Sequence, residues 1–491
     1  MKKIFLLSFY LIIISGAIAA QTGKGYSLED CRQLALKHNQ KLKIADEQVQ
    51  ASEELRKAAF TQYLPSFSIN GTYTGMTKEF QLLKQDMFLP VVPYNAIDAS
   101  TGKLSSAALS TPSIAASTFV INPATGKVVT DASGNPVFRN YSYLPASETM
   151  MDFRNIFMLN AGFTQPVFLG GKIYQLNRIA KANESIANNN KDLASDDLLF
   201  TVEDDYWRVI SLEEKVKLCQ DYKSMLEKLL YDLQNYRKEG IISENDLLRA
   251  KVRLTEVDLM LLKASNGLEL SKMVLCQLTG LDYNNSPVFA DPEALDIQDI
   301  SIDSLPGFKP ENRPEIRILN NGIEIADASV GIMKSRFLPN IALSAGFIAM
   351  NPDLYKGFTK EFGSDFTVGI VCNIPIFHFG EKARTLNAAR HERNAARLKL
   401  EETSELITLQ VRQSEFRYTE SARKTSLALL SLGQAKENLR VTNDNFAEGR
   451  LKTTDILEAQ AAWQKAVSEL IDAKAEQHTA LSNLKKVKGI H

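Results

Sequence analysis

The chain has 491 residues, with 57 lysine and arginine residues against 58 aspartate and glutamate residues. The resulting net charge of −1 argues against a nucleic-acid binder, which needs an excess or a dense patch of basic side chains. Four cysteines in so long a chain exclude a disulfide-stapled scaffold. Length alone suggests about three domains, and the mean hydropathy of −0.16 is typical of a soluble protein.

The first twenty residues have the pattern of a secretory signal. Lys2 and Lys3 precede an apolar run over residues 4–14, and small residues follow at positions 17, 19 and 20. This pattern predicts a cleavable signal peptide over residues 1–20 and an exported protein. No later stretch approaches the ~18 uninterrupted apolar residues of a membrane helix, so a membrane crossing would have to use β-strands.

The mature chain opens with a predicted helix over residues 27–63, because Ser27 and Asp30 form a capping-box signature. After Pro65 the apolar side chains alternate with polar ones, and a second alternating stretch surrounds residues 157–163. Period-2 alternation predicts strands with one apolar and one polar face. Each strand is about 10 residues long, the length of a tilted strand crossing a bilayer.

A segment rich in Ser, Thr, Ala, Asn and Pro separates these two strands, at residues 77–155. Turn signals occur at residues 122–126 and 133–136. The segment is therefore expected to be a long loop that carries a small hairpin of its own.

A very long helix is predicted over residues 172–238, which contain no proline. At 1.5 Å per residue, ~65 residues span roughly 100 Å. Gly240 suits the left-handed position that ends a helix, and a returning helix shows a heptad seam. Its positions are Leu247, Ala250, Leu254, Val257, Leu261, Ala264, Leu268, Ser271 and Leu275.

The second half repeats this plan after an irregular, proline-bearing region at residues 281–313. We expect a helix over residues 314–337, strands around residues 341–347 and 366–372, a long helix over residues 381–448 and a turn at Gly449. The second seam consists of Ile456, Ala459, Trp463, Ala466, Leu470, Ala473, Gln477, Ala480 and Leu484.

Two landmarks place the halves in register. Pro166 and Pro375, each in a Pro-Val/Ile-Phe motif, are 209 residues apart (375 − 166), and so are Gly240 and Gly449 (449 − 240). The constant offset predicts two copies of one unit, at residues 21–280 and 314–491, on either side of the 281–313 region. The expected fold class is mainly α, with four strands for which membrane insertion and a soluble sandwich both stay open. A four-stranded sheet cannot close into a barrel by itself, so membrane insertion would require strands from several chains.

The order of these elements resembles the TolC-type outer-membrane efflux protein family (outer membrane factor). The resemblance rests on the opening helix at residues 27–39, on the two Pro-Val/Ile-Phe corners, and on the Gly-x5-Asp turns at Gly240 and Gly449. It implies a homotrimer with a 12-stranded barrel in outer-membrane lipid and a coiled-coil tunnel in the periplasm. It also implies a passive channel docked to a periplasmic adaptor and an inner-membrane efflux transporter, with neither cofactor nor metal.

The resemblance assigns roles to residues near the turns. Asp455 and Glu458, one helical turn apart, match acids that point into the pore and select for cations. The alternative is that they only complement a helix dipole at a helix start.

Asp246 matches an acid that closes the tip by pairing with a basic residue, for which Arg450 and Lys452 are the candidates. Phe446 and Leu451 depart from the family pattern at this place. The turns at Gly240 and Gly449 are expected to contact the adaptor, and Pro166 and Pro375 to form the strand-to-helix corners.

Enzyme signatures are not found in the sequence. The five histidines have no metal-ligand spacing, and neither a phosphate loop nor a nucleophile turn occurs. The four cysteines are expected to be unpaired and buried. The alternative function is a periplasmic helical-hairpin structural or adaptor protein without a membrane barrel. Efflux and protein secretion use the same component, so the exported substrate stays open.

Overall fold

The computed structural model describes residues 25–285, 287–289, 302–357 and 359–490. The expected signal peptide over residues 1–20 lies outside these ranges. The chain forms two units, and each sequence half contributes to both. The helical unit comprises Met1–Thr61, Gly170–Leu338 and Pro375–His491, and the strand unit comprises Gln62–Leu169 and Pro339–Ile374.

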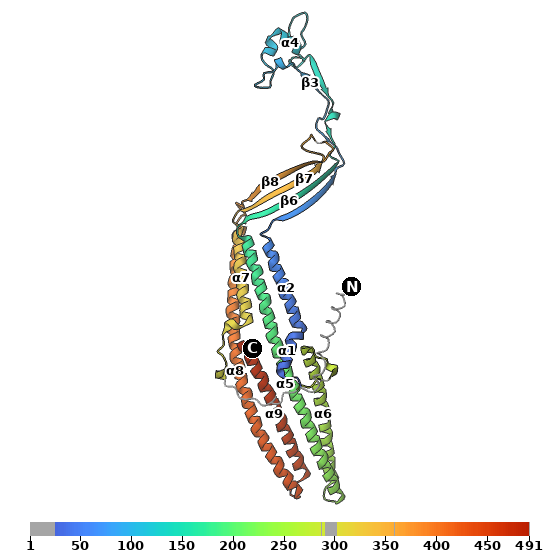
Figure 1. Ribbon diagram of the computed structural model, residues 1–491, viewed down its shortest axis with the longest axis vertical. Coiled ribbons are helices and arrows are strands. Elements are labelled where there is room, and N and C mark those ends of the chain that lie inside the picture. The colour runs from blue at the N-terminus through green and yellow to red at the C-terminus, as the bar shows by residue number, and fades with distance from the viewer. Residues whose placement is uncertain (1–24, 286, 290–301, 358, 491) are drawn as a thin grey trace, which may run out of the picture. The chain divides into compact units, whose positions relative to one another are not determined.

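Two long helical hairpins dominate the helical unit (Figure 1). The first consists of α5 (Lys172–Lys238) and α6 (Glu244–Thr279), with 67 and 36 residues. The second consists of α8 (Glu381–Ala447) and α9 (Thr453–Lys488), again with 67 and 36 residues. The predicted long helices are thus confirmed to within a residue or two, because the 3.6-residue pattern is strong and free of proline.

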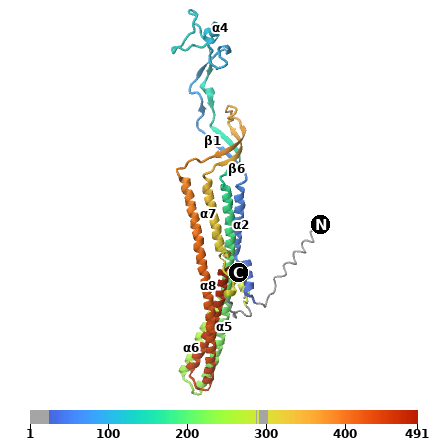
Figure 2. The ribbon, with the colours of Figure 1, turned by 90° about the vertical axis from the view of Figure 1, so that its left-hand side faces the viewer.

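The helices pack side by side in a row, so that the outermost helices form two free edges of the helical unit. Near the hairpin turns α6 packs on α5, α5 on α9, and α9 on α8. Further along, α2 (Gln40–Thr61) packs on α5, and α7 (Pro314–Ser335) packs between α5 and α8 (Figure 2). Helix α8 therefore forms one margin of the unit, and α6 with α2 forms the other. In the described ranges, every helix is too short or too polar to cross a membrane.

Both predicted heptad seams are confirmed, since none of their side chains is exposed. Leu247, Val257 and Leu275 are buried on α6, and Ile456 and Leu470 are buried on α9. Interior packing of this kind supplies most of the stability of a long helix, since propensity alone is weak.

The predicted helix over residues 27–63 is interrupted, which corrects the sequence expectation. Helix α1 (Leu28–His38) opens with the predicted Ser27–Asp30 capping box, but Asn39 has an extended backbone and α2 starts after it. The Asn39 amide Nδ2 donates to the carbonyl of Leu278 over 3.1 Å, and its Oδ1 accepts from the N–H of Lys41 over 2.8 Å. A side chain that satisfies backbone groups on both sides stabilises the break.

The strand unit contains a four-stranded antiparallel sheet in the order β1 (Ser66–Gly75), β6 (Asn155–Leu169), β7 (Asn340–Asn351) and β8 (Gly363–Asn373). The strand register places most apolar residues of all four strands on one face and most polar or small residues on the other. Phe67, Phe163, Ala345 and Val368 form one row, and Ser68, Gly162, Gly346 and Thr367 form a row on the opposite face. One face is therefore mainly apolar and the other mainly polar, as the period-2 pattern predicts.

The segment at residues 77–155 is more structured than a loop with one hairpin. Strands β2 (Phe80–Gln81) and β5 (Met150–Met151) pair, as do β3 (Met87–Val91) and β4 (Asn140–Leu144). Beyond this ribbon lie η1 (Tyr94–Ala96), α3 (Ala107–Ser110) and α4 (Pro112–Thr118), around a core of Ala96, Ala108 and Phe119. Single-residue bridges close three similar turns, at residues 97–104, 121–128 and 130–136. The short helix η2 (Ala146–Thr149) leads back to the sheet.

The region at residues 281–313 consists of short 3-10 turns where the structure describes it. These are η3 (Tyr283–Asn285), η4 (Ile302–Ser304) and η5 (Pro310–Asn312). Residue 286 and residues 290–301 lie outside the described ranges. Phe289 pairs with Tyr26 in a parallel bridge, and both pack in the core beside α1 and α5.

Candidate functional site

The two hairpin tips share one backbone geometry. Gly240 and Gly449 have φ of 76° and 74°, in the left-handed region. In each tip the N–H of the following residue donates over 2.9 Å to a helix carbonyl, that of Tyr236 in the first tip and that of Asn445 in the second. This bond is the 6→1 link of a Schellman motif. The predicted chain reversals at the two glycines are confirmed.

Alanine at either tip glycine should weaken that tip. A Cβ at Gly240 or Gly449 would meet no atom within 4 Å, so the cost is the left-handed backbone alone, about 1 kcal/mol. Gly433→Ala is the matched control, because Gly433 has equally open space inside α8 and alanine there should stabilise by about 1 kcal/mol. Native-state hydrogen exchange would give the two opposite signs, whereas equal signs would show that the tip backbone is unstrained.

The tip acids cap their own helices. Asp246 is the third residue of α6, and its Oδ2 accepts from the Ser243 hydroxyl over 2.6 Å, while the Asp246 N–H donates to that hydroxyl over 3.2 Å. Asp455 is the third residue of α9 and accepts from the N–H of Lys452 over 2.9 Å. Each carboxylate thereby satisfies a free N–H at a helix start and complements the helix dipole.

The capping bonds use only one carboxylate oxygen of each aspartate. Asp246 and Asp455 are half-buried and use Oδ2 in these bonds. Glu458 is exposed, one turn after Asp455 on α9. The pair at Asp455 and Glu458 therefore shares one helix face near the second tip.

The basic candidates for tip closure are engaged locally or exposed. The Arg450 guanidinium lies 2.9 Å from the Glu448 carboxylate in its own turn, and Lys452 is exposed. Within the described part of a single chain, no ion pair joins Asp246 to either of them.

An apolar cluster behind the tips locks the two hairpins together. Its buried members come from all four long helices: Tyr222, Leu226, Leu229, Leu233, Leu247, Ala250, Val257, Leu439, Ile456 and Ala459. Phe446 and Trp463 pack against it. The Tyr222 hydroxyl accepts from Arg253 Nε over 3.1 Å, and burial raises the pKa of Tyr222. The phenylalanine that departs from the family pattern thus has a packing role.

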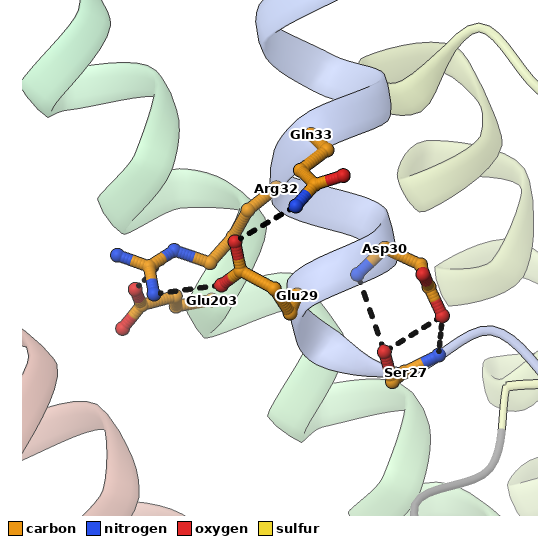
Figure 3. A network of polar contacts seen from close by, with 6 residues as sticks. All are labelled: Ser27, Glu29, Asp30, Arg32, Gln33 and Glu203. Atoms are coloured by element: carbon orange, nitrogen blue, oxygen red, sulfur yellow. Dashed lines mark hydrogen bonds and ion pairs between the residues drawn. The ribbon is translucent and has the colours of Figure 1, made fainter.

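A second anchor joins α1 to α5 (Figure 3). Arg32 Nε lies 3.2 Å from Glu203 Oε1, and the side chain of Glu203 is only 7% exposed. The same guanidinium reaches Glu29 over 3.3 Å. Arg32 and Glu203 were not singled out from the sequence, because nothing local marks a contact between residues so far apart in the chain.

The two corner prolines occupy different positions. Pro375 lies between β8 and α8. Pro166, however, lies inside β6 at an irregularity of the register before Phe168. The reversal after β6 occurs at Gly170 and Gly171, with φ of 62° and 83°. Pro166 is therefore a strand residue and not the corner, and this part of the expectation is corrected.

The cysteines are free, but one of them is exposed. Cys31, Cys219 and Cys276 are buried, as predicted, whereas Cys372 on the outermost strand β8 is exposed. Burial raises the pKa of the Cys31 thiol to about 12, with a smaller effect of Asp30, so this thiol is not a nucleophile at neutral pH. Among the described residues, no His, Cys, Asp and Glu side chains gather into a metal site.

Known proteins share this arrangement. A profile of the family described as "Outer membrane efflux protein" matches residues 310–489. The alkaline protease secretion protein AprF of Pseudomonas aeruginosa is 20% identical over 360 residues, which cover 72% of this chain and 74% of AprF. Residues 310–489 of this chain thus match the outer membrane efflux protein family.

Further known proteins are similar to this chain. The cobalt-zinc-cadmium resistance protein CzcC of Cupriavidus metallidurans is 22% identical over 337 residues, or 66% of this chain and 75% of CzcC. The CmeC outer membrane channel of Campylobacter jejuni has the same fold, with a TM-score of 0.65 and 17% identity, over 94% of this chain and 85% of CmeC. The family is one of outer-membrane transport proteins, and the adaptor alternative is not favoured.

Proposed function

We propose that the chain is the outer-membrane channel of a tripartite efflux or secretion system, a passive duct that is closed at its periplasmic tips. The observation that carries this proposal is that both edge strands of the sheet are unpaired on one side. Strands β1 and β8 each have one partner strand and one free edge. A free edge in lipid leaves backbone groups unsatisfied, so other copies must supply the missing neighbours.

The helical unit has margins that support the same assembly. Helix α8 exposes Leu398, Leu409, Phe416 and Leu427, and α6 exposes Val252, Leu259, Leu262 and Leu270. The spacings of three, seven, eight and eleven residues keep each set on one helix face. An apolar stripe at such spacing packs on another helix, and in a ring α8 of one copy would meet α6 of the next.

The resemblance supports an assembly of three copies. Three copies of a four-stranded sheet give a twelve-stranded barrel, and the two hairpins of each copy give a periplasmic α-barrel. The equal lengths of α5 and α8, and of α6 and α9, support the duplication into residues 21–280 and 314–491. The region at residues 281–313 would then form a girdle around the helices.

The two faces of the sheet take different surroundings in this assembly. The row with Phe67 and Phe163 would meet lipid, and the row with Ser68 and Thr367 would line a wet lumen. The segment at residues 77–155, which joins β1 to β6, would face the outside of the cell.

The gate lies at the tips in this proposal. Asp455 and Glu458 of each copy would form acidic rings that favour cations, and Asp246 would pair with Arg450 or Lys452 of a neighbouring copy to hold the tip closed. The turns at Gly240 and Gly449 would contact the periplasmic adaptor, which links the channel to an inner-membrane transporter.

Efflux and secretion both remain candidates for the transported substrate. The names of AprF and CzcC refer to protease secretion and to metal resistance. Since these relatives match similar shares of the chain, the comparison favours neither substrate class.

Extraction from membranes and bilayer recording test the proposal together. The mature protein should need detergent for release and should give discrete, long-lived conductance steps in a planar bilayer. Release by buffer or high salt alone, with no conductance, would overturn the channel and favour a periplasmic structural protein.

A further inference from the structure

The ribbon in the segment at residues 77–155 exposes a continuous aromatic face. Register places Phe88 opposite Tyr143 and Pro90 opposite Tyr141, all on one side of β3 and β4. The rings of Phe88 and Tyr143 lie 5.2 Å apart between centroids. Their side chains are 65% and 54% exposed. Apolar rings this exposed on a secreted chain indicate a contact surface.

Hydrogen bonds hold the two tyrosine rings in place. The Tyr143 hydroxyl donates to Asp86 over 2.7 Å, a bond that holds the pKa of Asp86 below its ordinary value. The Tyr141 hydroxyl accepts from the N–H of Phe138 over 3.1 Å. Rings that are already ordered lose little conformational entropy on binding, so the face is prepared for a partner.

The properties of β3 and β4 favour packing of another surface on the face of the ribbon over addition of a strand to its edge. A two-stranded ribbon is marginally stable in water, and neither β3 nor β4 contains a charged residue. Pro90 is the fourth of the five residues of β3 and has no N–H to donate, which disfavours the addition of another strand there. Packing of one ring-bearing face against another apolar face is the arrangement that remains.

We propose that the occupant of this aromatic face is the same face of further copies of this chain, which together form a collar beyond the outer mouth of the channel. The inference rests on the proposed function. The ribbon connects β1 to β6, and β1 is the margin strand where copies would join. Rotational symmetry then brings one ribbon from each copy to the same rim, around one axis.

The chemistry of the face suits a meeting of identical surfaces. Neither β3 nor β4 carries a charged side chain, and the nearby Asp86 carboxylate accepts the hydrogen bond of the Tyr143 hydroxyl. Aromatic rings pack well in offset or edge-to-face pairs, and the tyrosine hydroxyls already have partners in their own chain. Burial of the Tyr143 ring would thus leave its hydroxyl bonded to Asp86.

Cysteine crosslinking tests the collar with a matched pair of neighbours. Tyr143→Cys places a thiol on the aromatic face, and Ser142→Cys places one on the opposite face at the same height. Cys372→Ser removes the exposed native thiol, and the three buried cysteines remain. In the purified full-length protein, a short bismaleimide should link Tyr143→Cys chains at least about tenfold faster than Ser142→Cys chains, because proximity raises the effective concentration.

Two further measurements keep the outcome clear. Phe88→Cys is a second reporter on the aromatic face, for the case that Tyr143→Cys does not fold, and it should behave in the same way. Equal rates for both faces in a protein whose mass is that of several chains would overturn the collar and leave the proposed channel intact. A protein with the mass of one chain would overturn the proposed channel itself.

Discussion

Arg32→Ala should detach α1 from α5, with a loss of about 2–3 kcal/mol in local stability. The change leaves the Glu203 carboxylate buried without its cationic partner. Breaking a fully buried pair in this way costs about 3–5 kcal/mol, and a smaller loss is expected here because the Arg32 side chain is still 27% exposed. Hydrogen exchange of the α1 amides should therefore become about 30- to 150-fold faster.

Two variants separate charge burial from general damage. Glu29→Ala removes the more exposed partner of the same guanidinium and should cost less than about 1 kcal/mol. The double variant Arg32→Met with Glu203→Met removes both charges and should recover most of the stability, since no unpaired charge remains. Equal exchange in Arg32→Ala and Glu29→Ala would show that the buried pair does not anchor α1.

Asp455→Asn combined with Glu458→Gln should reduce the cation preference of the channel by roughly tenfold, which corresponds to ~1.4 kcal/mol. In the proposed channel each chain would then lose two negative charges from the acidic rings, whose Coulomb interaction with a passing cation is strong at short range. Asparagine retains the oxygen that accepts from the Lys452 N–H, so the start of α9 should stay capped. Reversal potentials in asymmetric potassium chloride measure the change.

A matched charge removal elsewhere on the second hairpin controls for net charge. Glu437 and Asp444 both bind Arg440 on α8, over 2.7 and 2.8 Å. Glu437→Gln with Asp444→Asn removes the same charge and should leave the reversal potential unchanged. If Asp455→Asn with Glu458→Gln also leaves the reversal potential unchanged, the two acids have no role in the pore. Asp455 then serves only to cap α9.

The features that the sequence predicted well are those fixed by neighbours in the chain. Helices α5 and α8 follow from an unbroken 3.6-residue pattern. The left-handed turns at Gly240 and Gly449 and the Ser27–Asp30 capping box need only contacts within a few residues. The alternation in β1 and β8 likewise defines the two sheet faces before any partner strand is known.

The features that escaped sequence reasoning depend on distant contacts. Asn39 interrupts the first helix because the carbonyl of Leu278 lies within its reach, and no local pattern shows this. The Arg32–Glu203 pair joins two helices that are far apart in the chain. The Phe119 core in the segment at residues 77–155 forms among short elements whose apolar side chains show no long periodicity.

The two tip acids make contacts within one chain and have proposed roles between chains. Asp246 and Asp455 start their helices in a way that one chain fully explains. Their proposed roles in closure and selectivity involve other copies of the chain, so neither the local sequence nor the contacts within one chain decide them.

In the proposed channel, copies of this chain join at the free edges of the sheet and of the helical unit. Light scattering of the detergent-purified protein, corrected for bound detergent, tests this most directly. The protein mass should be three times that of the mature chain at all concentrations, because free β1 and β8 edges cannot persist in lipid. A mass of one chain under the same conditions would contradict the claim.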